Sequence, residues 1–210
     1  MNHVLLRVTT YVTGLVILAF GIALTLKADL GAGAWDALNA GLVKQFGFTV
    51  GTWVIVVGVI VIMVNAALLT RRPDLFALIP VFLIGPFVDF FMLQLLGTWE
   101  PEGVILRLVV LITAVLLLAF GIAVYLQAGF APVPFDGLMM AIQERTGLSL
   151  RVSKTAGETA ALIAAFLAGG PIGLGTIIVT FFIGTFIQFF TPYVVSVLDY
   201  MKNKEAPHSL

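Results

Sequence analysis

Leu18-Ala19-Phe20-Gly21-Ile22-Ala23 recurs one hundred residues later as Leu118-Ala119-Phe120-Gly121-Ile122-Ala123. The same offset relates further positions, among them Asp36 and Asp136. The chain is therefore a duplicated unit, and the repeated stretch is apolar. Duplicated apolar units with interrupted helices are typical of secondary membrane transporters.

The composition places most of the chain in a lipid bilayer. Of 210 residues, 60% are hydrophobic and 10% are charged, and the mean hydropathy is +1.12. Soluble domains carry about 25% charged residues. The formal net charge is zero, so no nucleic-acid partner is indicated. The absence of cysteine excludes disulfides, thiolate catalysis and Cys-ligated metals, and no motif indicates a cofactor or a metal site.

The apolar runs predict an all-α membrane protein. A spanning helix needs about 20 mostly apolar residues. The repeat divides the chain into two units, 1–102 and 103–210, with three predicted spans in each. The six candidate spans are 5–26, 52–69, 75–96, 104–126, 153–168 and 172–197.

One connector in each unit differs from an ordinary loop. It begins with a glycine- or proline-containing segment and continues as a predicted short helix, 36–47 or 136–147, that ends at a glycine. A helix of a dozen residues is about 18 Å long, whereas the hydrocarbon core is about 30 Å thick. We therefore expect each short helix either to re-enter the membrane at a binding site or to lie on its surface. A surface helix would place Asn39, Lys44 and Gln45 on its polar side.

The distribution of lysine and arginine predicts the orientation. Three spans per unit make the second unit inverted relative to the first, and an N-terminus inside gives eight basic residues inside and three outside. The inner set is Arg7, Arg71, Arg72, Arg145, Arg151, Lys154, Lys202 and Lys204, and the outer set is Lys27, Lys44 and Arg107. Eight spans in parallel repeats would give the same tally. The length of the short helices favours six spans, with both termini in the cytoplasm of a bacterial inner membrane.

Three segments carry a family resemblance: the run 23–31, then Ala34-Trp35-Asp36 and Gly51-Thr52-Trp53. They are similar to the A-x-L-G-x-x-P-W-D and G-x-x-x-G-x-W segments of the YczE-like group of bacterial membrane proteins, which is related to the YitT-type group. Here alanine replaces the proline of the motif, and the second unit keeps it as Pro134. The resemblance implies a small polytopic inner-membrane protein and little about its function.

Asp36 and Asp136 lie at the predicted starts of the short helices, directly after Trp35 and Phe135. One interpretation is that each aspartate caps its helix, where it satisfies backbone N–H groups and the positive end of the dipole. The other interpretation is compatible with the first. If both helices start at a shared central cavity, these four residues form a site for a cation, a proton or an amine.

Further polar residues lie inside the predicted spans, where ionisable side chains are rare and often functional. Asp89 and its counterpart Gln188 are predicted either to form hydrogen bonds between helices or to line the cavity, with Asp89 as a proton-coupling carboxylate. Lys154 and Glu158 are predicted either to form a local i,i+4 ion pair or to act as a gate on the cytoplasmic side.

These features favour a small secondary transporter that moves a small solute by alternating access. The alternatives are a channel and a non-transporting membrane scaffold or regulator. No nucleophile–base pair indicates an enzyme. The small residues of the fifth span predict close helix packing, either inside the protein or across a homodimer; they are Ala160, Ala161, Ala164, Ala165 and Ala168.

Overall fold

The computed structural model describes residues 3–205, and all regular secondary structure within them is helical. The elements are α1 (His3–Ala28), α2 (Ala34–Phe46), α3 (Val50–Leu69), the 3-10 helix η1 (Leu75–Ala77), α4 (Leu78–Asp89), the π-helix η2 (Phe90–Leu95), α5 (Val104–Gln127), α6 (Pro134–Thr146), α7 (Leu150–Leu167) and α8 (Leu174–Glu205). The predicted all-α class is confirmed. The two ends of the chain, 1–2 and 206–210, lie outside the described residues.

Five helical segments are long and apolar enough to cross a membrane. They are Val4–Ala28, Val50–Leu69, Leu75–Leu95, Val104–Gln127 and Leu174–Lys202. The remaining predicted span corresponds to α7, which has 18 residues but carries Arg151, Lys154 and Glu158. Composition therefore supports five of the six predicted spans.

The short helices α2 and α6 begin two residues earlier than predicted. Asp36 and Asp136 consequently lie in the first turn, and neither caps its helix, because the N-cap positions are Gly33 and Val133. The prediction of aspartate caps was wrong, although a carboxylate in the first turn still faces the positive end of the helix dipole. The glycines after the two helices, at positions 47 and 147, have φ of 76° and 74° and end them as predicted.

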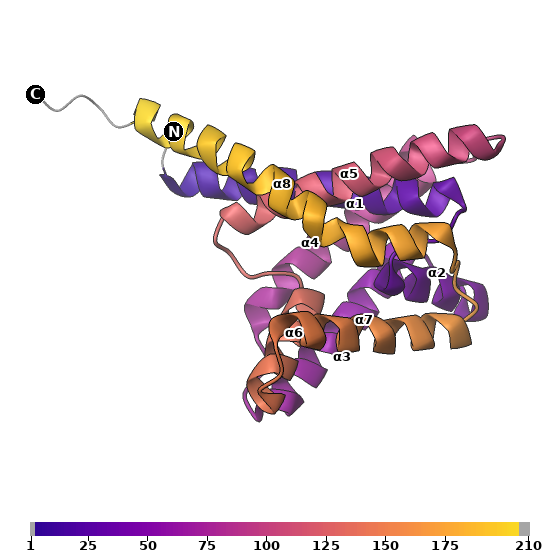
Figure 1. The fold of residues 1–210 in the computed structure, drawn as a ribbon, viewed down its shortest axis with the longest axis horizontal. Helices are drawn as coiled ribbons and strands as arrows, with labels where there is room; N and C mark the ends of the chain where they lie inside the picture. Colours follow the sequence, from indigo (N-terminus) through magenta and orange to yellow (C-terminus); the bar gives the residue numbers. More distant parts are fainter. Residues whose placement is uncertain (1–2, 206–210) are drawn as a thin grey trace, which may run out of the picture.

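Helices α1 and α5 form the most closely packed pair, and they lie side by side in Figure 1. A Cβ atom on Gly121 would lie 2.6 Å from the backbone nitrogen of Leu18, and one on Gly21 would lie 2.9 Å from that of Leu118. The repeated LAFGIA segments therefore cross at backbone distance, where only glycine fits. The main hydrophobic core lies around this crossing.

Helices α2, α3, α6 and α7 form a second group below this pair, whereas α8 packs against α5 (Figure 1). Helix α3 packs against α4 and α6, while α7 packs against α2 and α6. Ala161, Ala165 and Ala168 of the small-residue stripe are buried, and a Cβ on Gly41 of α2 would lie 2.8 Å from the Cβ of Ala168. Part of the stripe thus serves helix packing inside the protein.

The two short helices extend from the middle of the molecule toward opposite ends (Figure 1). The end of α2 contacts the end of α7, since Lys44 donates a hydrogen bond to the carbonyl of Gly169 (3.1 Å). The end of α6 contacts the end of α3 through the Arg71–Glu144 ion pair (2.7 Å). Their starts are therefore directed at the centre of the molecule.

Candidate functional site

The starts of α2 and α6 meet at a pair of stacked aromatic rings. The rings of Trp35 and Phe135 have centroids 4.5 Å apart and planes inclined by 23°. Each residue is the second of its short helix. Proline suits the first position of α6, because its missing N–H would be unpaired there in any case. Two corresponding helix starts, one from each unit, thus contact each other directly.

A cavity of about 460 Å³ lies at this contact. Its wall is mostly apolar, and much of it consists of corresponding residues from the two units. Eight pairs separated by one hundred residues line it: Leu18 and Leu118, Ile22 and Ile122, Gly33 and Val133, Ala34 and Pro134, Trp35 and Phe135, Asp36 and Asp136, Asn39 and Met139, and Val54 and Lys154. The structure therefore brings the four residues predicted at the short helices into one site.

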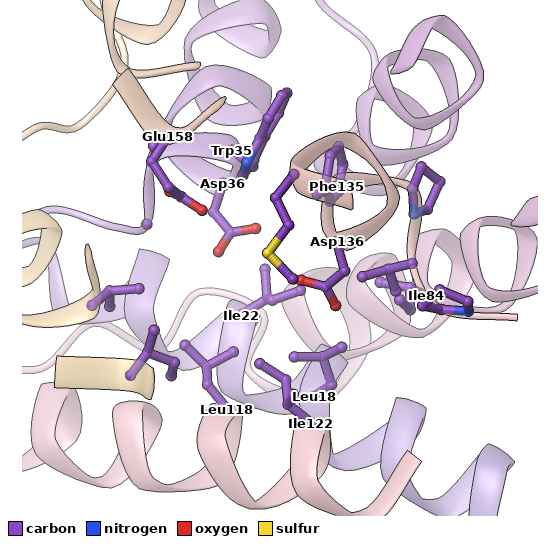
Figure 2. Close-up of a pocket in the computed structure, with 18 of the residues that line it drawn as sticks. Leu18, Ile22, Trp35, Asp36, Ile84, Leu118, Ile122, Phe135, Asp136 and Glu158 are labelled. Atoms are coloured by element: carbon purple, nitrogen blue, oxygen red, sulfur yellow. The ribbon is translucent and has the colours of Figure 1, made fainter. Parts of the chain in front are cut away.

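Four charged residues line the cavity: Asp36, Asp136, Lys154 and Glu158. Figure 2 shows Asp36 and Glu158 on the same side, near Trp35, with Asp136 farther across. Charges on Asp36 and Glu158 would repel each other, and the ammonium group of Lys154 would attract the carboxylates around the same cavity. The predicted local ion pair between Lys154 and Glu158 is not formed among the described residues, and both side chains instead line the cavity.

The two corresponding aspartates differ in their partners. The buried hydroxyl of Tyr125 donates a hydrogen bond of 2.7 Å to Oδ2 of Asp136. Thr25 occupies the corresponding place in the first unit, and its hydroxyl donates instead to the carbonyl of Ile22 (2.7 Å). Among the side chains of residues 4–202 and the backbone of the described helices and loops, no group makes a hydrogen bond to the carboxylate of Asp36. The two aspartates therefore correspond in sequence but differ in their hydrogen bonding.

Asn39 is a cavity residue that the surface-helix alternative placed on a polar side. It is instead fully buried (0% exposed) and lines the cavity. Neither its amide nitrogen nor its amide oxygen has a hydrogen-bond partner. Its position one turn after Asp36 on a helix was the available signal. Tyr125 was also missed, although it is a polar side chain near the end of an apolar span.

Asp89 and Gln188 do not line this cavity. The hydroxyl of Thr49 donates a hydrogen bond to Oδ2 of Asp89 (2.5 Å), and the backbone N–H of Gly51 donates to Oδ1 (2.7 Å). Asp89 thus joins α4 to the start of α3, as the interhelical alternative predicted. Gln188 is exposed on α8. The expectation that this pair shares a cavity with the aspartates is corrected, since both side chains face other surroundings.

The comparisons with known proteins agree with this membrane architecture. A model of a family of unknown function, DUF6198, matches residues 5–192. The chain is 37% identical to the "Uncharacterized membrane protein YczE" of Bacillus subtilis over 95% of this chain and 92% of that protein. It is 33% identical to the "Uncharacterized protein YyaS" of the same organism, over 88% of this chain and 92% of that protein.

A further relative, an "Uncharacterized protein" of Haemophilus influenzae, is 31% identical over 83% of this chain and 78% of that protein. No solved structure matches the chain. The resemblance to the YczE-like group, drawn above from three short segments, is confirmed along almost the whole sequence. The chain is an integral membrane protein that belongs to the DUF6198 family.

Proposed function

We propose that this protein is a small secondary transporter that carries a small solute across the bacterial inner membrane by alternating access. The observation that carries the proposal is the cavity at the meeting point of two interrupted segments, walled by corresponding residues of both units. In secondary transporters, substrate sites lie near the bilayer midplane at the interface between repeats, and half-helices point at them.

The proposed membrane arrangement has six spans and two re-entrant helices, built as two inverted repeats, 1–102 and 103–210. Each short helix has 13 residues, or about 20 Å of helix, which is too short to cross a core of about 30 Å. Their extension from the centre toward opposite ends supports the inversion (Figure 1). Helix α7 is the sixth span, because two of its charged side chains, Lys154 and Glu158, line the cavity.

The proposed orientation has both termini in the cytoplasm. The ion pair of Arg71 with Glu144 lies at one end of the molecule, and the ion pair of Arg107 with Asp29 lies at the other. The first end matches the side predicted to hold eight basic residues, and the second matches the side with three. An excess of lysine and arginine is characteristic of cytoplasmic loops.

Alternating access is supported by a difference in helix packing between the two units. Helices α3 and α4 are tightly packed, and a Cβ on Gly58 would lie 2.9 Å from the side chain of Val81. Their counterparts α7 and α8 hardly touch each other within the described residues. Two repeats that hold the same elements in a closed and an open arrangement can exchange these arrangements, which moves the opening from one side to the other.

Two charged side chains of α7, Lys154 and Glu158, act as a gate in the exchange between the closed and open arrangements. Lys154 and Glu158 occupy the positions that correspond to Val54 and Gly58, which are buried in the first unit. Closing α7 onto α8 would therefore bury an ammonium group and a carboxylate, which is costly unless they are paired or neutralised. A proton or a bound cation on the acidic side chains would lower that cost. We assign the gate role to these two residues on this ground.

The proposal is tested by locking the closed helix pair. A Cβ at position 58 would lie 3.5 Å from the Cβ of Val81, at the short end of the roughly 3.5–4.5 Å range of disulfides. The double variant Gly58→Cys/Val81→Cys, in this naturally Cys-free chain, should lose solute-driven charge movement in proteoliposomes on oxidation and regain it on reduction. Each single variant should be insensitive to the oxidant. A solute-independent current proportional to voltage would identify a channel and contradict the proposal, as would unchanged flux in the locked protein.

A further inference from the structure

We propose that the solute is a small organic monocation, an ammonium group on an apolar body, whose charged end is bound by Asp36 and Asn39 of α2 together with Glu158 of α7 (Figure 2). This inference rests on the transport function proposed above and adds the chemical class of the solute.

The charges of the cavity favour a cation. Its wall holds three carboxylates and one ammonium group, so acids are in excess. Asp136 is occupied by the hydroxyl of Tyr125. Lys154 lies one turn before Glu158 on the same helix and can offset one acid at most. Asp36 is left as a carboxylate in a mostly apolar wall with no donor from the described residues. A partly buried carboxylate without a donor is unfavourable, and a ligand with N–H groups and a positive charge supplies both the donors and the opposite charge.

Asn39 provides the second, independent indication of a ligand. Buried amide groups in folded proteins nearly always have a hydrogen-bond partner, and this fully buried one has none. It follows Asp36 by three residues on α2, so the two side chains lie on the same face of the helix. The amide oxygen of Asn39 can accept a hydrogen bond from the ammonium group that the carboxylate attracts.

The remaining wall favours an organic solute over an inorganic ion. It is formed largely by leucine, isoleucine and valine side chains with the Trp35–Phe135 stack, and its volume falls in the roughly 300–1,000 Å³ range of small-molecule sites. Among the side chains that the structure describes, those of residues 4–202, no three His, Cys, Asp or Glu are grouped to hold a metal ion. Met139 takes the place of Asn39 in the second unit, so the polar contacts gather at α2 and α7. The ammonium end should lie there, with the apolar body against α1 and α5.

The experiment measures binding to the full chain with one tryptophan left as the reporter. The chain has three tryptophans, and only Trp35 lines the cavity, so Trp53→Phe/Trp99→Phe leaves the reporter at the site. Four probes of similar size are titrated: benzylammonium, benzyl alcohol, benzoate and the zwitterion 4-(aminomethyl)benzoate. We expect saturable fluorescence changes with benzylammonium, and binding of the other three weaker by about tenfold or more, as the loss of a charged hydrogen bond implies. Equal or tighter binding of any of the three would overturn the assignment.

Variants then assign the contacts. Asp36→Asn should weaken benzylammonium binding by about tenfold or more. The same substitution outside the cavity, Asp89→Asn, should leave the affinity unchanged. Asn39→Leu, which removes the unpaired amide at similar volume, should also weaken binding and serves if Asp36→Asn fails to elute as a folded protein. Native affinity in a folded Asp36→Asn or Asn39→Leu protein would overturn the contacts proposed here.

Uptake of benzylammonium into proteoliposomes separates this inference from the transport function. Specific binding without uptake would overturn the transporter and leave the cation site standing. Uptake of a neutral or anionic solute, without benzylammonium binding, would overturn the cation site and leave the transporter standing.

Discussion

Replacement of Asp89 by alanine should destabilise the protein without weakening solute binding. The carboxylate accepts one hydrogen bond from the hydroxyl of Thr49 and one from the backbone N–H of Gly51, which lies in the first turn of α3. That N–H has no partner within its own helix. Hydrogen bonds to charged groups contribute roughly 1.5–3 kcal/mol in soluble proteins, whereas bonds between membrane helices average about 0.6 and reach about 1.7. Two bonds at about 1–1.5 kcal/mol each give a loss of about 2–3 kcal/mol in the free energy of unfolding.

The conservative variant Asp89→Asn should cost only about 1 kcal/mol, the charge assistance of the two bonds. The amide keeps an oxygen for the Gly51 N–H, and its NH2 group can donate to the Thr49 oxygen. The expected order of stability is therefore aspartate, asparagine, alanine. Equilibrium unfolding in mixed detergent and SDS micelles, followed by tryptophan fluorescence, measures the three values.

A double-mutant cycle with Thr49→Val isolates the bond between the two side chains, and the two changes should cost less together than the sum of their separate effects. The reasoning would be refuted if Asp89→Ala kept native stability within about 0.5 kcal/mol, the usual limit for a neutral surface substitution. It would also be refuted if the variant stayed stable and lost its solute binding, because Asp89 would then act at the site.

Three further predictions concern packing, topology and the second aspartate. Gly121→Val should prevent assembly of α1 with α5, because the new side chain would meet the backbone of α1, whereas Gly184→Val faces open space and should elute as native protein on size exclusion. Arg72→Cys should be labelled by an impermeant maleimide only from the cytoplasmic side of oriented vesicles, and Glu100→Cys only from the other side; labelling of both from one side would contradict six spans. Tyr125→Phe removes the hydroxyl that donates a hydrogen bond to Asp136. We expect benzylammonium to bind a few-fold more tightly to this variant, roughly the effect of one weak hydrogen bond, and calorimetric titration measures the change.

The class and element order of the fold were predictable because membrane helices can be recognised from their apolar composition. Long apolar runs and the one-hundred-residue repeat located the long helices and the two short helices to within a few residues, except the end of α8, which lies at Glu205 and not at the predicted position 197. Helix starts were less predictable. Aspartate is a common N-cap residue, yet α2 begins at Ala34, before Asp36. Gly33 occupies the N-cap position, and no side chain caps this helix.

The site was predictable where the repeat marked it and unpredictable where contacts between helices decided it. Asp36 and Asp136 were found by their spacing. The partner of Asp136, Tyr125, lies on another helix, so no local pattern could assign it. Asn39 shows the same limit: the polar side chains of Lys44 and Gln45 at the end of α2 gave the helix a polar side, but the packing of other helices against α2 buries the asparagine.

The glycine crossing of α1 and α5 has a consequence for any conformational cycle. At Gly21 and Gly121 the two backbones are separated by less than the width of a side chain, so neither helix can rotate or slide without a collision. This pair must therefore serve as a stationary frame. Any rearrangement in the proposed transport cycle should be confined to the helices around it, and a spin label on α1 should keep its distance to one on α5 while the distance between α7 and α8 changes.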